Sequence, residues 1–393
     1  MNKKAITALG KLMALIALAL TAVIVSSGIR VHADNGEIVR VKTAKELKAA
    51  IKDSNVGTII LRTNAYIDIT IKANNATKTK ELIVDAKNAN ITNKAVFEGI
   101  NIISANSYTE SASGNRIYLS DSYLPDGFTV AKKKKVGSLT IYNKHGVFEN
   151  CYTLRKGAKI GELTLIYSGG VYPEISEYNK SKRVLTIVAA DDCTRSYTIK
   201  LDKSGRMVSF DCESEWPEAD YDEKYTYDSN GNIVKTVGHD NTSGTYTIEK
   251  TYSGNKVIKS THKASYDSGT YTFEYDKDGR MVHREYHGED NIDGVPFSYN
   301  SIEDFEYDEK GRLIYERLED TGTDSFYETS YTYNSKSYLT EIYENISGSE
   351  ISWKYKYDKA GNLIKTTYTS EGYSDEYEYE YDEFGAVKSE WDN

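Results

Sequence analysis

Residues 355–361 read Tyr-Lys-Tyr-Asp-Lys-Ala-Gly, and variants of this stretch recur through the C-terminal half of the chain. The shared pattern is two aromatic residues separated by one residue and followed by Asp-x-x-Gly. It also occupies residues 225–231, 273–279, 305–311 and 379–385. The turns recur every ~25 residues, which is typical of a tandem array of small structural units.

Each copy predicts one β-hairpin. The two aromatic residues lie on one face of a strand, because strand side chains alternate between faces. In the turn, the Asp accepts backbone N–H groups and the Gly adopts a positive φ, as in a type I turn with a bulge. The predicted turn residues are Asp228, Gly231, Asp276, Gly279, Asp308, Gly311, Asp358, Gly361, Asp382 and Gly385.

Degenerate copies extend the array. They occupy residues 201–205, 252–255 and 331–337. A single hairpin is only marginally stable in water, so we expect the hairpins to stack side by side. The sequence therefore predicts an antiparallel all-β array over residues 191–393.

The Tyr-x-Tyr-Asp-x-x-Gly core resembles the YD-repeat (Rhs) family, which is also found in teneurin-like surface proteins. The resemblance covers about 200 residues. It implies an all-β spiral or sheet, extracellular or surface placement, and carbohydrate binding or adhesion. The four prolines do not form the proline-containing autocleavage motif of that family, and a full Rhs cage has far more repeats. We therefore expect no self-contained toxin capsule.

The first 33 residues have the pattern of a secretory signal peptide. Lys3, Lys4 and Lys11 precede an apolar run over residues 12–25, and residues 31–33 fit a cleavage site. The apolar run is shorter than the roughly 20 residues that span a bilayer. We expect an exported protein, secreted or at the cell surface, with no stable membrane insertion after cleavage.

The N-terminal half, residues 34–190, predicts a short capped β-solenoid. Thr43 and Glu46 form a capping box before a helix over residues 44–52. Short β-rich runs follow: Thr58–Leu61, Ile67–Ile71, Leu82–Val84, Ile100–Ile103 and Ile117–Leu119. Similar segments begin at Val136 and Ile160, 24 residues apart, and Ile59 and Leu82 are 23 apart. This period predicts stacked coils with the helix closing one end.

This region resembles a right-handed parallel β-helix of the pectate-lyase type. The resemblance rests on residues 45–51, 58–61 and 80–85 and implies, as an alternative function, polysaccharide cleavage. Lyases of that fold need clustered acidic calcium ligands and an Arg base, whereas Asp68, Asp85 and Arg116 are isolated in the sequence. We therefore expect no enzyme activity.

The charge differs between the two halves. Residues 34–170 contain 20 Lys+Arg and 13 Asp+Glu, a net charge of +7. Residues 171–393 contain 25 Lys+Arg and 46 Asp+Glu, a net charge of −21. The break near residue 170 indicates a domain boundary, and an acidic array excludes nucleic acid as its partner.

Tyrosine is the unusual component, with 34 Tyr against 9 Phe. Aromatic rings can form cross-strand pairs that stabilise a sheet, or platforms that stack on sugars while acidic neighbours accept hydroxyl hydrogen bonds. The main hypothesis is a non-catalytic protein that binds carbohydrate or a cell-envelope partner, and another alternative is an Rhs-like role in inter-bacterial competition. The candidate binding residues are Tyr225, Tyr227, Tyr275, Tyr307, Tyr355, Tyr357, Tyr379 and Tyr381.

Cysteine and metal-binding patterns are sparse. Cys193 and Cys212 flank a predicted hairpin, so a disulfide between them is a candidate. His283 and His287 lack zinc-site order, and a strand would hold them ~13 Å apart. The Asp-rich turns lack the bidentate Glu of a calcium loop. We expect neither a metal nor a cofactor.

Overall fold

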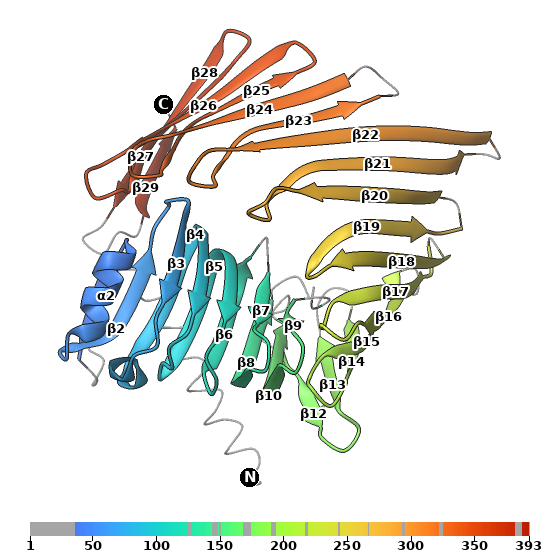
Figure 1. The fold of residues 1–393 in the computed structure, drawn as a ribbon, viewed down its shortest axis with the longest axis horizontal. Coiled ribbons are helices and arrows are strands. Elements are labelled where there is room, and N and C mark those ends of the chain that lie inside the picture. Colours follow the sequence, from blue (N-terminus) through green and yellow to red (C-terminus); the bar gives the residue numbers. More distant parts are fainter. Residues whose placement is uncertain are drawn as a thin grey trace.

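The computed structural model contains two β-sheets and two short helices within the residues that it describes (Figure 1). The structure describes residues 36–124, 127–143, 148, 151–167, 174–189, 194–216, 219–242, 244–265, 267–292, 295–321, 325–381 and 387–392. The predicted signal peptide lies outside these ranges. Among the described residues, no helix has the length and hydrophobicity that crossing a membrane requires.

The first sheet, sheet A, has 11 strands that are mostly parallel. Its main strand order is β1-β2-β4-β5-β6-β8-β10-β11, while β3, β7 and β9 pair beside it. The strands are β1 (Glu37–Val41), β2 (Val56–Arg62), β3 (Ile67–Ile71), β4 (Glu81–Asn93), β5 (Gly99–Glu110), β6 (Arg116–Tyr123), β7 (Phe128–Val130), β8 (Lys135–Asn143), β9 (Thr153–Leu154), β10 (Lys159–Tyr167) and β11 (Glu174–Ile175).

The spacing seen in the sequence matches the pairing between parallel strands. Ile59 pairs with Leu82, and Val136 pairs with Ile160. One side of these strands is apolar throughout, and Ile59 and Leu82 on that side are fully buried. In-register stacking of branched apolar residues gives sheet A a continuous hydrophobic core.

Helix α2 (Ala44–Lys52) has the predicted bounds. The Thr43 side chain accepts from the Glu46 backbone N–H, and the Glu46 carboxylate accepts from the Thr43 N–H, so the capping box is confirmed. Leu47, Ala50 and Ile51 are buried against sheet A. The 3₁₀ helix η1 (Asn75–Thr79) leads into β4.

The second sheet, sheet B, is an 18-stranded antiparallel meander in which each strand pairs with the next along the chain. Its strands are β12 (Glu177–Asn179), β13 (Val184–Ala189), β14 (Arg195–Leu201), β15 (Met207–Ser214), β16 (Tyr221–Tyr227), β17 (Ile233–Asp240), β18 (Gly244–Ser253), β19 (Lys256–Lys263), β20 (Asp267–Tyr275), β21 (Met281–Ile292), β22 (Val295–Tyr307), β23 (Leu313–Asp320), β24 (Ser325–Tyr333), β25 (Leu339–Ile346), β26 (Ser349–Tyr357), β27 (Leu363–Ser370), β28 (Tyr373–Tyr381) and β29 (Val387–Asp392).

The predicted hairpin turns are confirmed in the described repeats. Gly311 has φ 80°, and the Asp308 side chain accepts from the backbone N–H of Lys310 and Arg312. The strand register shifts between Glu306 and Tyr307, as expected of a bulge beside the turn. Asp382 and Gly385 of the last predicted turn lie outside the described residues.

The change of sheet falls earlier than the predicted domain boundary. β11 of sheet A ends at Ile175 and β12 of sheet B begins at Glu177. The boundary predicted at residues 190 and 191 lies outside the described residues, after β13 in the sequence. The hairpin of β12 and β13 has no Tyr-Asp motif, so the motif could not reveal it. The charge break near residue 170 lies closer to the observed change.

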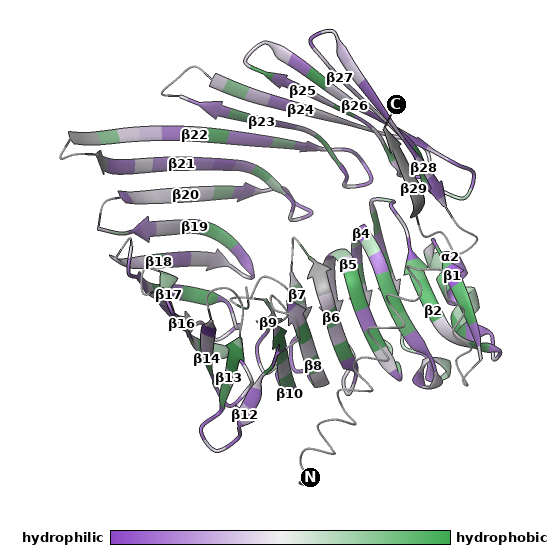
Figure 2. Ribbon diagram, turned by 180° about the vertical axis from the view of Figure 1, so that it is seen from behind, coloured by the Kyte–Doolittle hydropathy of each residue, from purple (hydrophilic) through white to green (hydrophobic). Residues whose placement is uncertain are grey.

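Sheet B curls so that both of its ends contact sheet A (Figure 1). Near its start, the Lys156 N–H donates to the Asn230 carbonyl over 2.7 Å. Near its end, the Tyr66 N–H donates to the Ser337 carbonyl over 3.0 Å, and Lys42 donates to the Ala360 carbonyl. Strands β20–β22 lie apart from sheet A in both Figures 1 and 2.

Candidate functional site: an aromatic face of sheet B

In five of the repeats, the second aromatic residue of the motif donates a hydrogen bond to the preceding hairpin. The Tyr307 hydroxyl donates to the Met281 carbonyl over 2.8 Å. The same bond recurs from Tyr227 to Met207 at 2.7 Å, and from Tyr252 to Ile233, Tyr275 to Val257 and Tyr333 to Leu313, each at 2.8 Å. These tyrosines therefore join one repeat to the next.

A cation from the preceding turn lies over one face of four of these rings. The Arg280 guanidinium lies 5.1 Å from the centroid of Tyr307, and Asp276 accepts from its Nε over 2.7 Å. The arrangement recurs for Arg206 over Tyr227 at 4.6 Å, Lys256 over Tyr275 at 5.1 Å and Arg312 over Tyr333 at 4.4 Å. Burial raises the pKa of the Tyr227 and Tyr333 hydroxyls, so they remain protonated donors.

The predicted binding tyrosines lie on the face of sheet B that is turned toward sheet A. Tyr225 is buried, with 6% of its surface exposed, in the core shared by the two sheets. Tyr227, Tyr275, Tyr307, Tyr355, Tyr357, Tyr379 and Tyr381 are half-buried. Tyr357 stacks on Tyr338, with ring centroids 5.0 Å apart. Tyr355 and Tyr357 line one shallow pocket together with Tyr338, whereas the other predicted tyrosines are spread along one edge of the sheet.

The turn carboxylates are held by their own turns. Desolvation raises the pKa of the Asp276 carboxyl, but hydrogen bonds from the backbone and guanidinium of Arg280 outweigh it, and the pKa is lowered. Asp228 and Asp308 behave in the same way, with Asn232 and Arg312 as donors. These aspartates therefore accept hydrogen bonds within their own turns.

A second group of aromatic residues lies on the same face, nearer the opposite ends of the strands. This group, which we call the aromatic strip, consists of Tyr246, Tyr271, Tyr286, Phe297 and Tyr299 from β18, β20, β21 and β22. The centroid of Tyr286 lies 4.3 Å from that of Tyr271 and 5.4 Å from that of Tyr299. Phe297 continues the strip at 6.0 Å from Tyr299.

Three buried glycines lie beneath these rings. A Cβ added to Gly238 would overlap the ring of Tyr246. A Cβ on Gly269 would overlap the ring of Tyr286, and one on Gly288 would meet both Tyr286 and Tyr299. The missing side chains let the rings lie flat on the backbone, as aromatic residues do when they cover glycines in sheets.

The polar groups of the strip form a defined network. Glu223 accepts from the Tyr246 hydroxyl over 2.6 Å, and the hydroxyls of Tyr286 and Tyr299 are 3.2 Å apart. Desolvation, followed by the bond to Tyr299, raises the pKa of Tyr286. The Arg284 guanidinium lies 5.7 Å from the Tyr271 centroid. The rings are thus fixed by neighbours before any ligand arrives.

The strip lies outside the buried core. That core extends along sheet B only as far as Tyr225, with Tyr227 and Ile233 packed against it. The four strip tyrosines are half-buried, and Phe297 is 54% exposed. Strands β20–β22, which carry every strip residue except Tyr246, lie apart from sheet A (Figure 2). The strip therefore combines fixed rings with open faces.

The sequence contains a signal for the strip outside the Tyr-Asp motif. Gly238, Gly269 and Gly288 lie inside strands β17, β20 and β21, and a glycine inside a strand often marks a close approach of another group to the backbone. The glycines pair with or lie diagonal to tyrosines, a relationship that depends on strand register. The motif predicts the strand register only next to the turns, and these glycines lie far from the turns.

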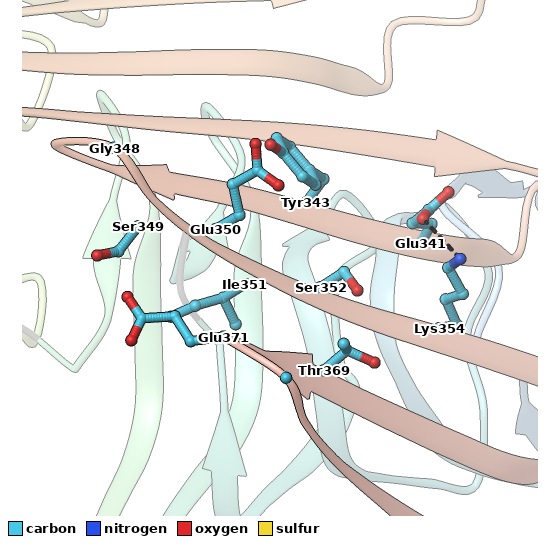
Figure 3. A pocket seen from close by; sticks show the side chains of 11 residues that line it. Glu341, Tyr343, Gly348, Ser349, Glu350, Ile351, Ser352, Lys354, Thr369 and Glu371 are labelled. Atoms are coloured by element: carbon cyan, nitrogen blue, oxygen red, sulfur yellow. Dashed lines mark ion pairs between the residues drawn. The ribbon is translucent and has the colours of Figure 1, made fainter.

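A shallow hollow lies on the opposite face of sheet B, at the loops between β25 and β26 and between β27 and β28 (Figure 3). Its lining includes Tyr343, Glu350 and Glu371. Glu341 and Lys354 pair across its floor at 3.6 Å. With one aromatic side chain, Tyr343, this hollow lacks the row of rings that distinguishes the strip.

The three residues considered for a lyase site, Asp68, Asp85 and Arg116, each interact with a different partner. Asp85 pairs with Arg62 at 2.6 Å, Asp68 accepts from Asn90 over 2.9 Å, and Arg116 donates to the Glu98 carbonyl. Within the described ranges, no three His, Cys, Asp or Glu side chains are grouped closely enough to hold a metal ion.

The predicted disulfide remains a prediction. Cys212 is buried in β15, and Cys193 lies outside the described residues.

Comparison with known proteins gives only distant similarity. No family model matches the chain, and no curated protein matches it. A crystal structure of TcdB2-TccC3-TEV aligns at 13% identity and TM-score 0.30, over 56% of this chain and 14% of that one. A porin-like protein from Bacteroides uniformis aligns at 12% identity and TM-score 0.26, over 51% of this chain and 89% of that one. These likenesses are too weak to assign a function.

Proposed function

We propose that this protein is an exported, non-catalytic binding protein that holds an extended carbohydrate on the aromatic strip. The observation that carries the proposal is the seating of tyrosine rings on Gly238, Gly269 and Gly288. Flat rings fixed in this way offer the C–H face of a sugar ring an apolar surface at no conformational cost.

The arrangement of the strip suits a chain-like ligand. Tyr271, Tyr286 and Tyr299 come from three consecutive strands, and neighbouring strands are spaced ~4.8 Å apart. Successive sugar units can therefore stack on successive rings. Glu223 and the tyrosine hydroxyls lie beside the rings and can exchange hydrogen bonds with sugar hydroxyls.

The remainder of the molecule is proposed to support this face. We interpret sheet A as a short β-solenoid capped by α2, and sheet B as a YD-repeat array fastened to it at both ends. The signal-peptide pattern of residues 1–33 supports export. In this proposal the motif tyrosines, Tyr227 and Tyr307 among them, form the framework and the strip binds the ligand.

The test is a glycan-array measurement with the full chain and three variants. Tyr286→Ala removes the central ring of the strip, and Gly288→Ala keeps every ring but displaces Tyr286 and Tyr299. Tyr343→Ala is the matched control, because it removes a ring from the opposite face. We expect the two strip variants to lose binding and the control to retain it. Binding that all three variants retain would contradict the proposal.

A further inference from the structure

We infer that sheet A carries a second binding site, separate from the aromatic strip, for a linear acidic polymer. The site lies on two stacked turns, one between β7 and β8 and one between β9 and β10, near the start of sheet B (Figure 1). The exposed lysines of these turns and of the strand starts that follow form a group that we call the lysine ladder: Lys132, Lys133, Lys135, Lys156 and Lys159.

The two turns have the same shape and lie directly on each other. Each is closed by a hydrogen bond between its first and fourth residues, over 3.1 Å in the first turn and 2.7 Å in the second. Between the turns, the Lys133 N–H donates to the Lys156 carbonyl over 3.1 Å, and the Lys159 N–H donates to the Lys134 carbonyl over 2.9 Å. The backbone beneath the lysines is therefore fixed.

The stacking places like charges side by side. Lys135 and Lys159 are direct partners across β8 and β10, and the same shift along the chain places Lys132 beside Lys156. Neighbouring strands are ~4.8 Å apart, and like charges directly opposite each other destabilise a sheet. In the part of the chain that the structure describes, no carboxylate forms an ion pair with any lysine of the ladder. The ladder is thus a row of positive charge without a local counter-charge.

Lys133 occupies a backbone position that favours glycine. Its φ is 61°, and the equivalent residue of the second turn is Gly157, with φ 72°. A Cβ added to Gly157 would lie 3.5 Å from the Lys133 Cγ, so the stem of Lys133 lies over that glycine. A side chain in the left-handed region costs stability that glycine would not lose. The chain has a lysine here despite that cost, which favours a role in binding.

The residue types indicate a polymer of repeating charges. All the side chains of the ladder are lysines, whose ammonium groups act as compact point charges, whereas arginine is better suited to the bidentate recognition of one fixed anion. A row of point charges can hold a charged strand in more than one register. Residues 131–135 and 155–159 contain no aromatic and no large apolar residue, so they offer no group to insert into a bilayer and no ring on which nucleic acid bases stack.

The rest of the molecule favours a narrow partner. The second turn is bonded to sheet B, where the Lys156 N–H donates to the Asn230 carbonyl, and residues 171–393 have a net charge of −21. A broad anionic surface on the ladder would also approach this acidic sheet and be repelled. A single strand can follow the ladder alone, because charges are screened beyond a Debye length of about 8 Å at physiological salt. Polymers of phosphodiesters and of uronates share this chemistry.

The experiment titrates the full chain calorimetrically with two acidic polymers, poly(glycerol phosphate) and polygalacturonate, and with two comparison ligands, oligo(dT) and phosphatidylglycerol vesicles. We expect at least one acidic polymer to bind more tightly than both comparison ligands, and its affinity to fall as the salt concentration rises. The two polymer arms distinguish phosphate from carboxylate as the source of the charge.

Lys133→Gly separates binding from folding. Glycine suits the positive φ, so this variant is expected to melt at the same or a higher temperature while its affinity for the polymer falls about fivefold, the effect of one lysine contact. Adding Lys132→Gln and Lys156→Gln is expected to bring the loss to about a hundredfold. The matched control removes three exposed lysines from sheet B and should keep the affinity: Lys277→Gln, Lys310→Gln and Lys356→Gln.

Three results would overturn the inference. They are binding of neither acidic polymer, equal affinity of the triple ladder variant and the unchanged chain, and tighter binding of oligo(dT) or of the vesicles. None of them bears on the proposed function, because the aromatic strip lies on sheet B and the glycan array tests it separately.

Discussion

Gly231 lies against the backbone carbonyl of Leu154 so closely that a Cβ at this position would overlap the carbonyl oxygen. The neighbouring Lys156 N–H donates to the Asn230 carbonyl over 2.7 Å. A turn of sheet B is thereby fitted onto sheet A. Gly231 is needed at this turn for two reasons: it has a φ of 90°, and only a residue without a Cβ can lie this close to Leu154.

Gly231→Ala is predicted to destabilise the protein more than Gly311→Ala. Both glycines have positive φ, which costs alanine roughly 1–2 kcal/mol. At Gly311 the nearest atom to an added Cβ is the flexible Arg280 Nη1 at 3.3 Å, whereas at Gly231 it is backbone. The free energy of unfolding in urea measures the difference. Equal losses in the two variants would contradict the fitted contact.

Tyr307→Phe is predicted to lower the stability by about 1 kcal/mol, because the hydroxyl bond to the Met281 carbonyl is lost while the ring stays. Tyr327→Phe is the control, since Tyr327 is 47% exposed, and it should change the stability little. The free energy of unfolding of the two variants is measured by denaturant titration. If both lose the same amount, the bond between repeats is not a source of stability.

The stability of the protein is predicted to rise as the pH falls from about 8 to about 5. Glu110 is buried in sheet A, and desolvation raises the pKa of its carboxyl to about 7, against donors that include Asn93, Ala112 and Asn115. The unfolded carboxyl titrates near 4.5. Between these values the folded state binds a proton that the unfolded state does not, so its contribution is lost as the pH rises through 7.

Glu110→Gln provides the control for this pH dependence. The amide cannot titrate, so the slope between about pH 5 and 8 should flatten even if the variant is less stable at every pH. Chemical denaturation at several pH values gives the measurement. A slope that persists unchanged in the variant would assign the effect to other groups.

Tyr66→Ala is predicted to loosen the C-terminal end of sheet B. The Tyr66 ring lies 5.0 Å from that of Tyr333, and it is one of the contacts that fasten this end to sheet A. Hydrogen exchange should accelerate in β24–β28 and stay unchanged in β16–β18. Tyr178→Ala, at an exposed tyrosine of β12, should leave both regions unchanged. Uniform acceleration along sheet B would contradict this role.

Local chemistry explains which elements could be predicted from the sequence. The capping box of Thr43 and Glu46 fixes α2, and the Asp-x-x-Gly turns fix the hairpins, because these signals depend on residues within one turn. The all-β fold and the parallel spacing of Ile59 and Leu82 follow from the period of apolar residues. The same reasoning placed the tyrosines of each motif on one face.

Long-range geometry explains the rest. The roles of Tyr227 and Tyr307 depend on carbonyls of the preceding repeat, and the seating of Tyr286 on Gly269 depends on register across two strands. A local motif predicts neither of these contacts. The binding surface inferred from the structure therefore moves from the motif tyrosines to a strip nearer the other ends of the strands.

The most direct test of the binding surface is side-chain footprinting of the full chain by hydroxyl radicals, with and without the oligosaccharide that binds most tightly on the glycan array. Phe297, Tyr343 and Tyr373 are 54%, 36% and 59% exposed, so all three should label in the absence of ligand. The ligand is predicted to protect Phe297 and the strip tyrosines and to leave Tyr343 and Tyr373 unchanged. Protection of Tyr343 or Tyr373 with Phe297 unchanged would contradict the assignment of the aromatic strip as the binding surface.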